Sequence, residues 1–136
     1  LRGAVQSAAD RFPWLDYRGP VSGRAKASML FESELLLLPG RVGLTAIDSL
    51  AAGRPIVTLA SSLHGPEFGY LEPGRTCVVS DGVEDAARSI VTLLRDRQAL
   101  ATMQDSCRRA SQKYSIENMA QYFHGGLKEA IKDDDE

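Results

Sequence analysis

Several features that would assign this chain to a class of protein are missing from its sequence. No apolar run approaches the ~20 residues of a membrane-spanning helix, and the leucine run at residues 35–38 has only the length of a strand. An excess of one charge is missing too, because 16 basic and 18 acidic side chains leave a net charge of −2. That balance gives no general attraction for nucleic acid or anionic lipid. The first residues also lack the basic and apolar regions of a secretory signal.

Cysteine is scarce, and its placement excludes further classes. Cys77 and Cys107 fit no metal-ligand spacing, and no other cluster of metal ligands is present. Two cysteines do not make a disulfide framework, so we expect reduced thiols and a cytoplasmic setting. No serine or cysteine has a base at the spacing of an activated nucleophile, so a hydrolase has no support.

What is present is the composition of a soluble globular domain. The 136 residues are 43% hydrophobic and 25% charged, which is enough for one domain with a core of its own. The chain begins with Leu1 inside a helical pattern, which predicts a fragment of a longer protein. We divide it into a partial folded domain at residues 1–132 and a solvated acidic tail at residues 133–136.

Apolar spacing along the chain predicts an alternation of helices and short strands. Helices are expected at residues 1–12, 22–32, 43–52, 83–95, 96–113 and from 115 onward, and strands at residues 14–18, 34–38, 55–59 and 76–79. The aliphatic run at residues 34–38 predicts a strand buried on both faces. The alternation predicts an α/β fold with a parallel, Rossmann-like sheet and helices on both faces.

The turn at residues 39–43 is the first candidate for a binding site. It follows a buried strand and leads directly into a helix, at the edge of the sheet where ligands of open parallel sheets gather. The first N–H groups of a helix have no intrahelical acceptor, and the helix dipole is positive there. Gly43 has no Cβ to keep a phosphate away from them. The turn therefore predicts an anion site, with a diphosphate as the commonest fit, although many such turns contain glycine and bind nothing.

Other side chains near this edge carry weaker signals. Asp48 is the one acid on its helix and is placed to accept ribose hydroxyls, or it lies on the wet side without a role. His64 and Glu67 share the loop after residues 55–59, where a catalytic pair is one interpretation and loop solvation the favoured one. Arg41 lies in the turn itself, where a cation would meet a phosphate.

These residues also carry a resemblance. The stretch "GLTAIDSLAAGRPIV" is similar to the signature of retaining glycosyltransferases of the GT-B fold, family 4 type. Gly43 and Leu44 match its Gly-Leu pair, Asp48 takes the place of its second Glu, and the matches continue at Ala51, Gly53, Pro55 and Val57. The likeness continues through "FPWLDYRGPVSGRAKASMLFESELLLLP" upstream and through "HGPEFGYLEPGRTCVVSDGVEDAARSIVTLLRD" and "KYSIENMAQYF" downstream, so it spans residues 11–123.

The resemblance implies a role for each matching position. The turn of Gly40, Arg41, Val42, Gly43 and Leu44 would hold the diphosphate of a nucleotide-sugar donor such as a UDP- or GDP-sugar. Asp48 would bind the ribose, the backbone at Pro20 and Val21 would line the base pocket, and Glu67 would contact the donor. No cofactor and no metal are implied.

The implied function is the donor-binding part of a retaining glycosyltransferase, which passes the sugar to a saccharide or glycoconjugate acceptor. The acceptor would bind an N-terminal domain outside this chain. We expect the protein in the cytoplasm, and any peripheral contact with a membrane surface would come through that other part. Two alternatives stay open: a non-catalytic Rossmann-like partner module, and another GT-B enzyme such as a nucleotide-sugar epimerase.

The chain departs from the family pattern in three places. Gly40 stands where the family's first Glu contacts the donor sugar. Asp48 is one methylene shorter than Glu. The first two strands of the family's domain, with a basic pair, are missing upstream. This predicts an interior gap in the sheet between residues 14–18 and 34–38, unless those strands pair directly or a partner supplies the missing ones. We therefore expect the 136-residue chain alone to be inactive as a transferase.

Overall fold

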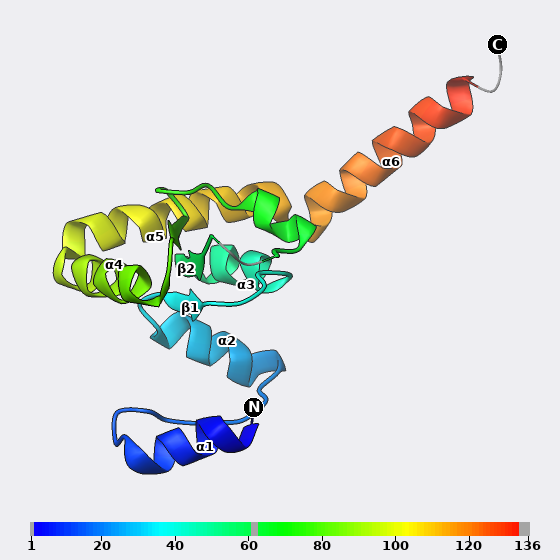
Figure 1. Ribbon diagram of the computed structural model, residues 1–136. Coiled ribbons are helices and arrows are strands. Elements are labelled where there is room, and N and C mark those ends of the chain that lie inside the picture. Colours follow the sequence, from blue (N-terminus) through cyan, green and yellow to red (C-terminus); the bar gives the residue numbers. More distant parts are fainter. Residues whose placement is uncertain (1, 61–62, 134–136) are drawn as a thin grey trace.

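The structure is a computed structural model that describes residues 2–60 and 63–133. In chain order, the elements are α1 (Arg2–Arg11), α2 (Gly23–Glu32), β1 (Leu36–Leu38), α3 (Thr45–Ala52), β2 (Ile56–Leu59), the 3₁₀ turn η1 (Pro66–Tyr70), β3 (Cys77–Ser80), α4 (Val83–Arg95), α5 (Arg97–Ser111), the 3₁₀ turn η2 (Gln112–Tyr114) and α6 (Ile116–Asp133). Figure 1 shows a central body around the strands, with α1 below it and α6 projecting from it.

The strands form one three-stranded sheet in the order β1-β2-β3. Both pairings are parallel, with Leu37 beside Val57 and Val57 beside Val78. Each crossover contains a helix or a 3₁₀ turn, as parallel strands require. The predicted α/β class with a parallel sheet is confirmed.

Helices cover both faces of the sheet, and the alternation of side chains along β2 shows why. Ile56 joins a core cluster with Leu50 of α3 and Cys107 of α5. Its neighbour Val57 points to the opposite face and joins a second cluster with residues of α4. Successive side chains of a strand face opposite ways, so the apolar side chains of Ile56 and Val57 need helices on both sides of β2. Both Ile56 and Val57 are fully buried.

At β1 the prediction of burial on both faces is wrong. Leu36 and Leu38 pack against the first cluster, but Leu37 on the other face is 49% exposed. The reason is lateral position: α4 packs against β2 and β3, and β1 is the edge strand beyond its reach.

The strand predicted at residues 14–18 is also wrong. These residues form an irregular segment in which Trp14 is 79% exposed and Asp16 pairs with Arg18. A strand needs a neighbour to satisfy its backbone groups, and no described strand lies beside this segment. The predicted interior gap therefore does not arise. The sheet of the described residues is continuous, and β1 is its edge.

The last helix begins where the sequence predicts. Ser115 caps it, because its Oγ accepts the N–H of Asn118 at 3.1 Å. α6 then runs to Asp133, and the rest of the predicted acidic tail, residues 134–136, lies outside the described residues. Among the helices described here, none combines the length and the apolar character that a membrane span requires.

Candidate functional site

The turn of residues 40–44, here called the β1–α3 turn, joins the carboxyl end of β1 to α3. Its hydrophobic anchor is Val42, which is fully buried and belongs to the same core cluster as Ala46 and Leu50 of α3. At the start of the turn, the Thr58 hydroxyl of β2 donates to the Leu38 carbonyl at 2.7 Å. The end of β1 and the middle of the turn are thus both fixed to the body.

His64, in the segment between β2 and η1, also holds the turn. Its Nδ1 accepts the N–H of Val42 at 3.2 Å, and its Nε2 lies 3.2 Å from the carbonyl oxygen of Leu59 at the end of β2. Because Nδ1 accepts, the hydrogen of the neutral ring is on Nε2, which donates to Leu59. The ring also stacks on Phe68, with centroids 4.2 Å apart. The favoured interpretation of His64 as a solvated loop residue is therefore wrong: it is half-buried and bonded through both nitrogens.

The N–H groups of Gly43, Leu44 and Thr45 have no acceptor among the described residues. They precede the first amide that is satisfied within the helix, that of Ala46, which donates to Gly43 at 2.9 Å. Of the residues predicted to bind a diphosphate, Val42 directs its N–H to His64 instead, and Thr45 is an open donor that the sequence analysis missed. The arrangement can bind an anion through backbone N–H groups at the positive end of α3.

Glu67 is the acidic neighbour of these amides. A Cβ built on Gly43 would lie 4.0 Å from Oε2 of Glu67, and one built on Gly65 would lie 2.5 Å from the same oxygen. The carboxylate therefore occupies space beside the open end of α3, where its negative charge is stabilised by the helix dipole. An incoming phosphate would have to displace this side chain.

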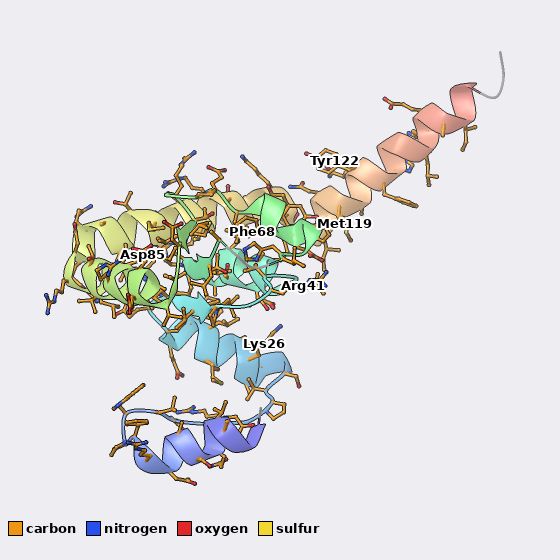
Figure 2. All side chains as sticks on the ribbon, in the orientation of Figure 1. Lys26, Arg41, Phe68, Asp85, Met119 and Tyr122 are labelled. Carbon is orange, nitrogen blue, oxygen red and sulfur yellow. The ribbon has the colours of Figure 1, made fainter. Side chains whose placement is uncertain are left out.

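Asp48 has a partner that sequence reasoning did not find. Nζ of Lys26 on α2 lies 3.0 Å from Oδ1 and 2.9 Å from Oδ2 of Asp48, and both side chains are partly exposed. The pair joins α2 to α3 across the edge of the sheet (Figure 2 labels Lys26 on α2). The sequence held no local signal for it, because 22 residues separate the two positions. Each carboxylate oxygen keeps a further lone pair for another donor.

The remaining predicted residues are less closely connected. Gly40 and Arg41 lie exposed in the turn, and Arg41 has no hydrogen bond or ion pair within the described part of the chain (Figure 2). Pro20 is exposed and Val21 half-buried, just before α2, and no hydrogen bond among the described residues joins either of them to the turn. The structure thus places Glu67 beside the turn and Asp48 against Lys26 of α2, and it shows no contact that extends this site to Pro20 and Val21.

A groove of about 670 Å³ opens beside the same end of α3. Leu44 and Ile47 of the α3 region line it, together with Glu67 and Tyr70 of η1. The other wall is Lys113 to Ile116 with Met119 and Tyr122 of α6. Its size is that of a small-molecule site, and its lining is largely apolar and aromatic.

The described residues contain no group of three or more His, Cys, Asp or Glu side chains that could hold a metal ion. The two thiols are enclosed in the core. Burial raises the pKa of Cys77 to about 11 and that of Cys107 to about 12. Neither is a nucleophile at neutral pH, because the reactive form of a thiol is the thiolate.

A comparison of the chain with models of known protein families found no match, and no curated protein matches it either. The residues of the site and the sequence resemblance are therefore the basis for a functional proposal.

Proposed function

We propose that the chain is the donor-binding part of a retaining glycosyltransferase and that the β1–α3 turn holds the diphosphate of a nucleotide sugar. The observation that carries the proposal is the set of open N–H groups at Gly43, Leu44 and Thr45, beyond the carboxyl end of β1. Ligands of parallel α/β sheets bind at this edge. Three adjacent donors at a positive helix end match the several acceptor oxygens of a phosphate.

In this proposal each neighbouring residue has a definite role. Asp48 accepts the ribose hydroxyls through the lone pairs that Lys26 leaves free. Arg41 adds positive charge to the diphosphate from the exposed side of the turn. Glu67 swings away from Gly43 when the phosphate enters and turns toward the sugar. The sugar acceptor binds a part of the protein outside this chain, and the 136-residue chain alone is therefore expected to be inactive in transfer.

Calorimetric titration of the chain with UDP, GDP and their sugars, at ligand above about 1 mM, tests the proposal. We expect heat of binding with at least one nucleotide. Gly43→Ala is expected to weaken the binding by about ten- to a hundredfold, because its methyl group enters the space beside the open amides and loss of one charge-assisted hydrogen bond costs about 1.5–3 kcal/mol. There is room for this methyl group in the folded protein, since its one neighbour within 4 Å would be Glu67 Oε2 at 4.0 Å.

Gly82→Ala is the matched control. Gly82 precedes α4 in the corresponding place after β3, and a Cβ there would meet nothing within 4 Å. Acidic residues Glu84 and Asp85 fill the first turn of α4, so this helix end is unsuited to a phosphate. Equal loss of affinity in both glycine variants would contradict the assignment of the β1–α3 turn.

A non-catalytic partner module is the second candidate, and a specific observation favours it. Glu67 lies beside the open amides of the β1–α3 turn, and Lys26 contacts both oxygens of Asp48. The two groups proposed to bind the diphosphate and the ribose therefore each have a neighbour within the chain. The absence of heat with every nucleotide would support this candidate over the enzyme.

A further inference from the structure

The face of α6 that carries no charge is an extended apolar surface without a partner in the described part of the chain. At 100° per residue one side of the helix collects eight apolar or small residues, here called the α6 stripe. Its members are Ile116, Met119, Ala120, Phe123, Gly126, Leu127, Ala130 and Ile131. No member belongs to either core cluster of the body, and Figure 1 shows α6 extending away from the body.

The exposed area is too large for an ordinary monomer surface. Ile116, Met119, Phe123, Leu127, Ile131 and the adjacent Tyr122 are each between 47% and 77% exposed. At roughly 200 Å² for a fully exposed large side chain, they leave about 800 Å² uncovered. That equals the area that one partner contributes to a standard interface, and it exceeds the roughly 300–600 Å² of the largest patch on a typical monomer.

We propose that the α6 stripe pairs with the α6 stripe of a second copy of this chain, antiparallel, about a two-fold axis at Phe123. The arrangement forms a dimer in which the far end of each α6 covers the groove at the base of the other. This inference is independent of any nucleotide binding.

The order of residues along the stripe is what assigns the second copy as the occupant. Positions equally far from Phe123 on its two sides are complementary: Ile116 faces Ala130 of the second copy, Met119 faces Leu127, and Ala120 faces Gly126. Ile116 thus meets a small residue, Met119 meets a side chain of similar size, and Ala120 and Gly126 let the helices approach closely at the third level. A two-fold axis requires such self-complementarity, because the same patch serves both partners.

The groove at the base of α6 completes the interface. Ile116, Met119 and Tyr122 line it and lie on or beside the stripe, so the two surfaces are continuous (Figure 2). A helix paired about Phe123 places its Leu127 and Ile131 opposite the start of the other α6. There the groove offers Leu44, Ile47 and the tilted pair of Tyr70 and Tyr114, whose ring centroids are 4.6 Å apart. The cavity of about 670 Å³ is large enough for these aliphatic side chains.

Sedimentation equilibrium of the 136-residue chain tests the proposal, with the monomer mass of 14.8 kDa as reference. Interfaces of standard size give dissociation constants from about micromolar to picomolar, so at about 100 µM we expect twice that mass. Phe123→Glu is expected to return the monomer, because it places two buried carboxylates at the axis. Gln121→Glu, on the polar side of the same helix, is the control and is expected to remain dimeric.

A disulfide test checks the orientation separately. A mixture of Met119→Cys and Leu127→Cys chains is expected to form the mixed cross-link on oxidation, and Met119→Cys alone to form little. The native thiols do not interfere, since Cys77 and Cys107 are fully buried. A wild-type chain that is monomeric at about 100 µM would overturn the proposal. So would a Met119→Cys chain that cross-links to itself more readily than the mixture does. If the chain is monomeric, the α6 stripe is a binding surface for a different partner.

Discussion

From the contact between His64 and the β1–α3 turn we predict how a substitution of His64 changes the free energy of unfolding. Replacing His64 with Phe keeps a ring to stack on Phe68 but removes both hydrogen bonds. The N–H of Val42, a fully buried residue, then loses its acceptor, which costs about 1–3 kcal/mol. With the weaker loss at the Leu59 carbonyl, the free energy of unfolding falls by about 2–4 kcal/mol. Because the unfolding entropy scales with chain length, this lowers the Tm by about 7–14 °C.

Thermal unfolding followed by circular dichroism, at one fixed protein concentration, measures this effect. His64→Ala should lose a further ~0.5–1.5 kcal/mol, because the stacking on Phe68 disappears as well. His124→Ala is the control, since His124 is exposed on α6 and its loss should change stability by less than about 0.5 kcal/mol. A His64→Phe protein as stable as the wild type would show that His64 does not hold the turn.

Three further predictions follow from other parts of the structure. Gly53→Ala should destabilise the protein by about 1–2 kcal/mol in a urea titration, because Gly53 ends α3 with φ 67°. Gly69→Ala, whose added methyl group would enter open space, should leave the free energy of unfolding unchanged in the same titration. Raising the pH should lower stability between about 8.5, the pKa of an unfolded thiol, and about 12, because burial raises the pKa of Cys107 and the unfolded chain releases that proton first. Urea unfolding of Cys107→Ala should show a shallower decline over this range, and an identical slope would contradict the argument. Finally, Lys26→Met should destabilise the protein by no more than about 1 kcal/mol, because the Lys26–Asp48 pair is partly exposed; a double-mutant cycle with Asp48→Asn measures the coupling.

The elements that the sequence predicted well are those whose signals are local. The helix at residues 83–95 coincides with α4, and its boundaries follow from apolar spacing between a glycine and an aspartate. The expected end of the helix at residue 52 is set by Gly53, which adopts the left-handed conformation, and the expected start at residue 115 is set by the Ser115 cap. In each case the deciding interaction is made within a few residues along the chain.

The elements that the sequence predicted poorly depend on what lies beside them. Residues 14–18 have the composition of a strand, yet without a neighbouring strand they remain irregular. The aliphatic run at β1 predicted burial on both faces, but the edge position leaves Leu37 half-exposed. Composition reports which residues suit a strand, whereas pairing and coverage come from distant parts of the chain.

The candidate site divides in the same way. Pattern and glycine spacing alone predicted that the β1–α3 turn presents the first amides of a helix at the ligand edge of a parallel sheet. Only the tertiary structure decided which amides stay open, because His64 takes that of Val42 from 22 residues away. It likewise decided that Glu67 lies beside Gly43 and that Lys26 holds Asp48.

By itself, then, the amino-acid order determined the alternation of helices and strands, the parallel sheet and the position of a helix start beyond β1. The folded chain decided the electrostatic surroundings of that start and left the apolar side of α6 uncovered. The physical reason is the separation along the chain of the residues that interact. Backbone conformation and side-chain periodicity are set by residues within a turn or two, whereas charge pairing and burial depend on segments that only folding brings together.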